Sequence, residues 1–173
     1  MREGFKLSLP RLLATAVATL GLALAAQTQT VAQTPASLDG TWTLNVARSD
    51  YGDFPGPNAE TLEIKSDGAA IRMKVASTVR RSTRTYELDL PTDGGETRFP
   101  LSGDIRVGTA ILRSAKASWR GETLVVSETI QHMSEMTVLE RAYTRSADGK
   151  SLTEQTTPKG GELQSTLVFD RSE

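Results

Sequence analysis

Residues 71–90 read IRMKVASTVRRSTRTYELDL, and their apolar side chains alternate with polar ones in two runs, 71–79 and 86–90. The positions concerned are Ile71, Met73, Val75, Val79, Tyr86, Leu88 and Leu90. A period of two is typical of β-strands that bury one face and expose the other. The stretch therefore predicts an antiparallel hairpin with one apolar face.

The same alternation extends outward in both directions, from Trp42 near the start to Phe169 near the end. Turn-forming pairs such as Asp67-Gly68 and Asp148-Gly149 interrupt it, and these residues adopt the positive φ angles that tight hairpins need. No part of this region shows a capped helical stripe. We expect an all-β fold, a single antiparallel up-and-down β-barrel of about nine or ten strands, because closure removes exposed sheet edges. A two-sheet sandwich is the structural alternative.

Residues 1–26 have the pattern of a secretory signal peptide. Three basic residues come first and are followed by a Leu- and Ala-rich run, 12–26, which is shorter than the roughly 20 residues that span a bilayer. Three small residues suit cleavage: Ala25, Ala26 and Ala32. Residues 27–37 are then a polar, flexible leader, and residues 38–173 form the barrel domain. We expect a periplasmic or secreted protein with no transmembrane segment after removal of the signal.

Composition excludes several classes of function. The chain has no cysteine, which rules out thiol catalysis and cysteine-based metal sites. Removing residues 1–26 takes away three of the 20 basic and one of the 21 acidic residues, and leaves a net charge near −3. Nucleic-acid binding usually needs a basic excess, so no nucleic-acid partner is expected.

The first predicted strand opens with Asp39-Gly40-Thr41-Trp42. This Gly-x-Trp sequence resembles the opening motif of lipocalins and related calycin barrels. The resemblance implies that Trp42 closes one end of the barrel and that a late arginine packs over it, and Arg171 is the residue that matches. The chain also resembles uncharacterised exported bacterial proteins that begin with Gly-Thr-Trp-x-Leu-Asn, which implies no activity. It lacks the Thr-Asp-Tyr motif and the C-terminal helix of lipocalins, and a Pro/Gly loop, 48–60, stands where fatty-acid-binding proteins have a helical lid.

The basic stretch within residues 71–90 suggests a ligand site. If Ser82-Thr83 forms a two-residue turn, Arg81 and Arg84 lie opposite each other on the apolar face, and an anion between them would relieve their repulsion. Residues 72–120 also hold ten basic but five acidic side chains, which favours an anionic ligand or partner. The hypothesis is a lipid-like anion with its head at these arginines and its chain along Met73, Tyr86, Leu88 and Leu90. The alternative is a different turn, which leaves the arginines on a solvated loop.

Two other residues are candidates for a polar role. Glu128 interrupts the apolar face formed by Val126 and Ile130, and a carboxylate there needs a partner or a wet cavity, unless a β-bulge turns it outward. His132 is the single histidine, and Glu135 or the nearby Met133 and Met136 are the ligands it would share with a metal. An exposed loop histidine without a metal is the simpler interpretation.

The sequence contains no Gly-x-Ser-x-Gly nucleophile elbow and no phosphate-binding loop that opens a helix. We therefore expect an exported, soluble, non-catalytic barrel that binds a small, partly apolar and amphipathic or lipid-like molecule, without a cofactor or a metal. Two alternatives stay open: an envelope-associated protein–protein interaction module with a filled barrel, and an enzyme whose site has no recognisable motif. The oligomeric state does not follow from the sequence.

Overall fold

The computed structural model describes residues 37–53, 55–100, 105–107 and 109–172. Residues 1–36, with the predicted signal peptide and most of the leader, lie outside the described part. Eleven strands and one short 3₁₀ helix occur among the described residues: β1 (Gly40–Leu44), η1 (Val46–Arg48), β2 (Ala59–Ser66), β3 (Ala70–Val79), β4 (Ser82–Pro91), β5 (Asp93–Arg98), β6 (Arg106–Val107), β7 (Ala110–Arg120), β8 (Thr123–His132), β9 (Glu135–Arg145), β10 (Ser151–Pro158) and β11 (Ser165–Arg171).

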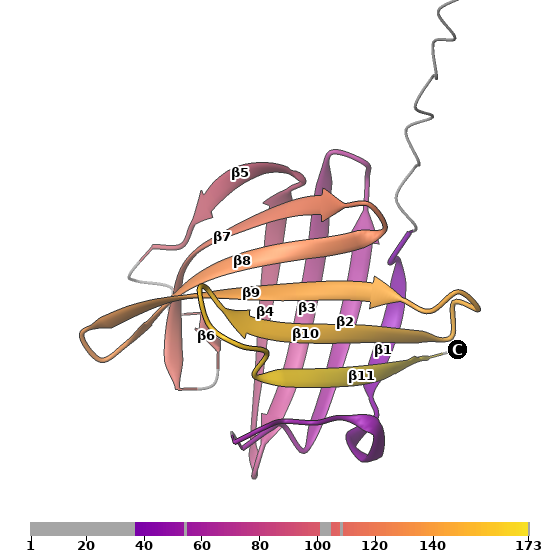
Figure 1. The fold of residues 1–173 in the computed structure, drawn as a ribbon, viewed down its shortest axis with the longest axis horizontal. Helices are drawn as coiled ribbons and strands as arrows, with labels where there is room; N and C mark the ends of the chain where they lie inside the picture. The colour runs from indigo at the N-terminus through magenta and orange to yellow at the C-terminus, as the bar shows by residue number, and fades with distance from the viewer. Residues whose placement is uncertain (1–36, 54, 101–104, 108, 173) are drawn as a thin grey trace, which may run out of the picture. The chain divides into compact units, whose positions relative to one another are not determined.

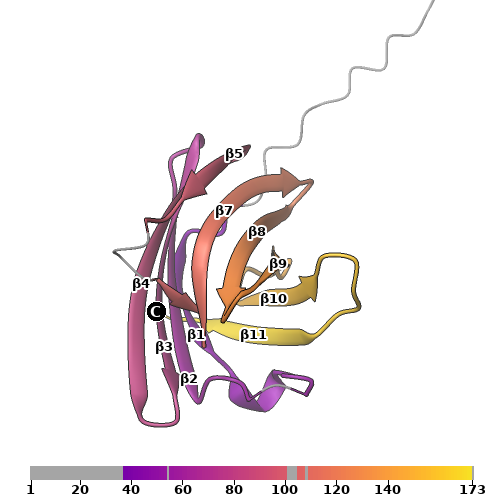
Figure 2. The ribbon, with the colours of Figure 1, turned by 90° about the vertical axis from the view of Figure 1, so that its left-hand side faces the viewer.

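The strands form one antiparallel sheet in the order β4-β3-β2-β1-β11-β10-β9-β8-β7-β5, and the two-residue strand β6 also pairs with β7. The first and last strands of the domain, β1 and β11, are neighbours, so the sheet curls back on itself. Figures 1 and 2 show β1–β4 as one wall and β7–β11 crossing it as the other. The fold is a nearly closed, antiparallel β-barrel, as predicted from the alternation and the turns.

The predicted hairpins form because short turns with left-handed residues join neighbouring strands. In the β7–β8 turn Gly121 has φ +63°, and in the β9–β10 turn Gly149 has φ +71°. A side chain would have room at Gly121, since nothing lies within 4 Å of the place that a Cβ would occupy. The glycine is therefore needed there for its backbone angle alone.

The β3–β4 hairpin differs from the prediction in its register. Val79 pairs with Ser82, so the turn is Arg80-Arg81 and not Ser82-Thr83. Arg80 adopts a left-handed φ of +58°, and its N–H donates to the side chain of Asn58 at 2.6 Å, which holds the turn in place. The expected pairing of Arg81 with Arg84 is therefore wrong: Arg81 is exposed at the turn, and Arg84 lies opposite Ser77.

The apolar core lies inside the barrel, as the period of two requires. Its buried side chains come from strands around the whole sheet and include Leu62, Ile64, Ile71, Met73, Leu88, Leu90, Leu124, Val126, Leu152 and Phe169. Ladder partners Met73 and Leu88 face each other across β3 and β4, and Ile71 faces Leu90. The outward residues between them are mostly charged and exposed.

Candidate ligand site on the inner face of the barrel

Trp42 of β1 lies in the buried core of the barrel. Its side chain is fully buried, and its indole N–H donates to the carbonyl oxygen of Leu38 at 2.9 Å. The Arg171 guanidinium lies 5.4 Å from the ring centroid and donates to the carbonyl of Asp39 at 3.0 Å. Gly40 has φ +142°, and a Cβ there would lie 3.3 Å from Arg171. The packing of Arg171 over Trp42 that the resemblance implied is present.

A charged cluster interrupts the apolar interior farther from Trp42. Arg141 of β9 donates from Nε to Glu128 of β8 at 2.8 Å, and from Nη1 to Glu154 of β10. Both carboxylates are almost completely buried, with 2% and 1% of their surface exposed, and the Arg141 side chain is 16% exposed. Thr156 donates to Glu154 at 3.2 Å and completes the cluster. We call Glu128, Arg141, Glu154 and Thr156 the inner cluster.

Strand register brings the inner cluster together. Arg141 lies between Val126 on β8 and Thr156 on β10, as its ladder partners on either side. Glu128 and Glu154 each stand two residues from those partners, in diagonal positions on the same face of the sheet. Side chains on alternate positions of a strand share a face, so all four point into the barrel.

Two tyrosines face the inner cluster. Tyr143 is the ladder partner of Glu154 and is 3% exposed, and Tyr86 lies on β4 opposite Val75. Burial, and then the nearby carboxylates, raise the pKa of both phenols well above 10, so both stay protonated. Within the part of the chain that the structure describes, neither phenol is hydrogen-bonded to another residue. Neither hydroxyl is among the fully enclosed side-chain atoms that lack a partner, so both hydroxyl groups are accessible to a water-sized molecule.

Glu60 of β2 adds a third carboxyl group to this interior region. Burial, and then the negative charge of Glu154, raise its pKa from 4.5 to about 7, against the hydrogen bond from Ser77 and the charge of Arg141. Ser77 is the ladder partner of Glu60 on β3. Burial alone would lower the pKa of Arg141, but the charges of Glu128 and Glu154 outweigh it and hold that pKa well above its ordinary value, so Arg141 stays charged.

The loop between η1 and β2 approaches the same region. Tyr51 packs against the core and donates its hydroxyl hydrogen to the carbonyl of Pro57 at 3.0 Å. Its ring lies against Gly56, where any side chain would collide with it. Burial and the charge of Glu60 raise the pKa of Tyr51, which places this loop near Glu60.

The structure locates every residue that the sequence had singled out for ligand or metal binding. Met73, Tyr86 and Leu88 lie on the inner face as predicted, and Glu128 points inward without a β-bulge in its own strand. Arg84 shares that face but is exposed, and Arg81 does not contribute to it. His132 is exposed at the end of β8, where its ladder partner is Glu135. Met136 pairs with Gln131 instead, so it projects from the face opposite to that of His132.

Sequence reasoning missed most of the site, including Tyr143, Thr156 and three charged members. Arg141, Glu154 and Glu60 were not singled out, although each occupies an inward position of a period-two pattern. Arg141 stands between Leu139 and Tyr143, and Glu154 follows Leu152 by two residues. A charged residue at an inward position of one strand was a usable signal for Glu128, and it applied equally to these three.

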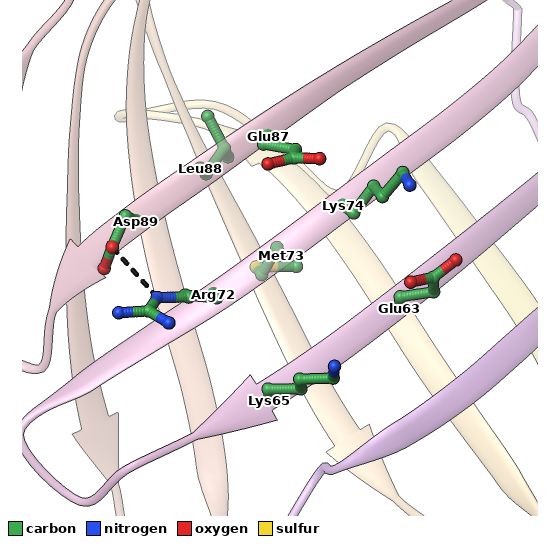
Figure 3. Close-up of a pocket in the computed structure, with 8 residues that line it drawn as sticks. All are labelled: Glu63, Lys65, Arg72, Met73, Lys74, Glu87, Leu88 and Asp89. Atoms are coloured by element: carbon green, nitrogen blue, oxygen red, sulfur yellow. Dashed lines mark hydrogen bonds and ion pairs between the residues drawn. The ribbon is translucent and has the colours of Figure 1, made fainter.

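An outer depression of about 440 Å³ lies on the opposite face of β2, β3 and β4 (Figure 3). Its charged side chains are three acids and three bases: Glu63, Glu87, Asp89, Lys65, Arg72 and Lys74. Lys74 is the cross-strand neighbour of Glu63 and of Glu87, whereas Lys65 lies opposite Arg72. Arg72 bonds Asp89 at 3.0 Å, with both side chains largely exposed. The depression is a solvated, balanced surface and not a charged site.

The described residues hold no group of three or more histidine, cysteine or acidic side chains that could bind a metal ion. The same part of the chain has no helix of the length and hydrophobicity needed to cross a membrane.

No family model matches this chain, and no curated protein matches it. Solved structures do. A secretory abundant heat soluble (SAHS) protein from Ramazzottius varieornatus has a TM-score of 0.57 at 14% identity, covering 80% of this chain and 98% of its own. Human cRBP IV, a cellular retinol-binding protein, has a TM-score of 0.54 at 19% identity, and the match covers 80% of this chain and 100% of the cRBP IV chain. SAHS protein 4 from Ramazzottius varieornatus has a TM-score of 0.51 at 14% identity, covering 78% and 94%. At these identities the likeness shows the fold alone: the described domain is a lipocalin-like β-barrel.

Proposed function

We propose that this barrel binds a small, partly apolar molecule in its interior, without catalysis. The polar part of the molecule lies at the inner cluster and its apolar part lies toward Trp42. Binding takes place in the periplasm or outside the cell, as the pattern of residues 1–26 predicts.

The observation that carries the proposal is the unbonded hydroxyl of Tyr143. Its side chain is 3% exposed, yet its hydroxyl group is not among the fully enclosed atoms that lack a partner, so a small polar group can reach it. In a barrel filled by its own side chains, the Tyr143 hydroxyl would be expected to have a hydrogen-bond partner within the protein. A bound molecule with polar atoms supplies the missing partner, and the same argument applies to Tyr86.

The inner cluster supports the proposal independently. Two carboxylates and a guanidinium lose their hydration inside the barrel, and well-packed apolar residues of similar volume are often equally stable or more stable. An arrangement that stability does not require is expected where a ligand must be oriented. Human cRBP IV, which has the same fold, is a retinol-binding protein, and this is the kind of occupant that a barrel interior accepts.

The first test is native mass spectrometry of the protein purified gently from its own cells, followed by organic extraction. We expect a mass increment from one bound small molecule and its recovery in the extract. A clean mass of the protein alone, with no thermal stabilisation by a panel of lipids and amphiphiles, would contradict the proposal and favour the filled interaction module.

A variant series separates binding from folding. Arg141→Leu leaves two buried carboxylates without a cationic partner and should lower the free energy of unfolding by about 3–5 kcal/mol. Adding Glu128→Met and Glu154→Met should restore most of that stability, because no uncompensated charge remains. Urea unfolding of the single and triple variants measures both effects.

The triple variant should fold and yet retain none of the co-purified molecule. Arg72→Gln with Asp89→Asn is the matched control, because it removes an ion pair from the outer face and should leave binding unchanged. A triple variant that still carries its ligand at wild-type occupancy would exclude the inner cluster from the site.

A further inference from the structure

We infer that the occupant presents a protonated amino group to the inner cluster: the ligand class is an amphipathic aliphatic amine and not a carboxylate or phosphate. This rests on the proposed function and names the chemistry that the same site selects.

The first argument is the balance of charge at the inner cluster. One guanidinium, Arg141, serves two carboxylates, Glu128 and Glu154, so the three groups carry one net negative charge. Glu60 of β2 lies near these groups, and it adds a further negative charge when its carboxyl group ionises. Like charges in a desolvated site repel, whereas a cation there is attracted by every carboxylate. A ligand carboxylate would add to the excess, and an ammonium group would cancel it.

The second argument concerns hydrogen-bonding capacity. Ionised carboxylates only accept, and each has about four acceptor positions. The hydrogen bonds among the described residues occupy one position on Glu128, from Arg141, and two on Glu154, from Arg141 and Thr156. An ammonium group brings three donors and no acceptor, which matches this surplus.

The unbonded phenols supply an independent observation. Tyr143 is only 3% exposed, belongs to the same inner face, and has no hydrogen bond to any other described residue. A phenol oxygen accepts a hydrogen bond from an ammonium group, and an aromatic ring attracts a cation to its face. Tyr143 and Tyr86 lie on opposite walls, on β9 and β4, and so flank the position of the head group.

Three other inward positions on the described strands hold arginine, and one of them is Arg171, which packs over Trp42. Arg84 is exposed and lies opposite Ser77, and Arg145 follows Tyr143 by two residues toward the Trp42 end, beside Leu152. Among the ion pairs of the described residues, the cationic partner of Glu128 and Glu154 is Arg141. A metal ion is not the cation that this site takes, because no group of described side chains could hold one. An organic cation fits, since buried Met73, Leu88 and Leu90 line the interior for its alkyl part.

The test compares three probes with the same twelve-carbon chain: dodecylamine, dodecan-1-ol and dodecanoate. Each displaces the uncharged fluorophore N-phenyl-1-naphthylamine from the full-length exported protein, after removal of any co-purified molecule, near neutral pH. We expect dodecylamine to displace it at a concentration at least about tenfold below dodecanoate, with the alcohol between them, a factor typical of one favourable charge interaction.

Glu128→Gln with Glu154→Gln should abolish or reverse this preference, and Glu60→Gln should reduce it. The outer-face control, Arg72→Gln with Asp89→Asn, should preserve it. The wild-type comparison needs no variant, so the inference stays testable even if the double variant does not fold.

Equal affinity for the three probes, an alcohol that equals the amine, or tighter binding of dodecanoate would each overturn the inference and leave the proposed function intact. Failure of all three probes, together with a fluorophore that does not bind at all, would contradict the proposed function and the inference with it.

Discussion

At the scale of single residues, Glu60 has a carboxyl group that titrates near neutral pH. Its pKa in the folded protein is about 7, above the ordinary 4.5 of an unfolded chain. The folded state therefore binds a proton more tightly than the unfolded state does. Stability from this group is present at low pH and is lost as the pH rises from about 4.5 to about 7.

We predict that the wild-type protein loses stability across this interval and that Glu60→Gln loses much less. The expected difference is a few kcal/mol, at about 1.4 kcal/mol for each pKa unit of the shift. Urea unfolding at a series of pH values measures it. Glu63→Gln is the control, because Glu63 lies on the outer face of the same strand and is exposed. Parallel pH profiles for wild type and Glu60→Gln would contradict the prediction.

The inner cluster shows what a sequence does and does not reveal about single residues. Glu128 was predictable as an inward carboxylate, because Val126 and Ile130 mark its face. The partner of Glu128 was not predictable. Arg141 is thirteen residues away in the sequence and contacts Glu128 only because β8 pairs with β9. Alternation gives the face of a residue but not its neighbours across the sheet, and the neighbours decide whether a buried charge is stable.

At the scale of elements, two-residue turns set the register of the hairpins. Met133-Ser134 joins β8 to β9, and Met133 adopts φ +55° with 85% of its surface exposed. The left-handed region costs an ordinary side chain on the order of 1 kcal/mol, and Asn is among the residues that adopt it readily.

We predict that Met133→Asn raises the free energy of unfolding by about 0.5–1 kcal/mol. Gly121→Ala should lower it by about 1 kcal/mol, since Gly121 has the same handedness and no neighbour to hinder a side chain. Met136→Asn serves as the control, because Met136 lies in strand β9 and should give no gain. Chemical denaturation of the three variants measures the effects, and a destabilised Met133→Asn would show that the methionine side chain has a role at the turn.

The β3–β4 hairpin explains why the predicted arginine pair failed. Neither Arg80-Arg81 nor Ser82-Thr83 contains the Gly or Asn that marks a tight turn. In the structure the turn is Arg80-Arg81, and Asn58, from a loop more than twenty residues earlier, accepts the N–H of Arg80. The strands and their faces were therefore predictable here, but the register was not, because no residue of the turn marks it and this contact comes from a distant part of the chain.

At the scale of the whole molecule, the barrel is closed by β1 and β11 but has a seam at β4 and β5. The closure was predictable, because about ten strands joined by short turns favour a closed sheet, and Arg171 was correctly expected over Trp42. The seam was not predictable, because the sequence around Pro91 and Thr92 has the features of an ordinary hairpin turn. In the structure no described ladder joins β4 to β5, β6 or β7.

This seam makes a prediction for amide hydrogen exchange. In an antiparallel ladder, alternate residues direct their N–H groups to opposite sides, so about half the amides of β4 point to β3 and the rest point to the seam. The described contact across it is weak: Thr97 of β5 donates from its hydroxyl to the carbonyl of Asp89 at 3.5 Å. Strand β3, between β2 and β4, has ladder partners on both sides.

We expect the seam-facing amides of β4 to exchange at least about tenfold faster than the amides of β3, because they open without disrupting a ladder. Exchange measured residue by residue by NMR tests this, and uniform protection along β4 would mean that the barrel closes fully in solution.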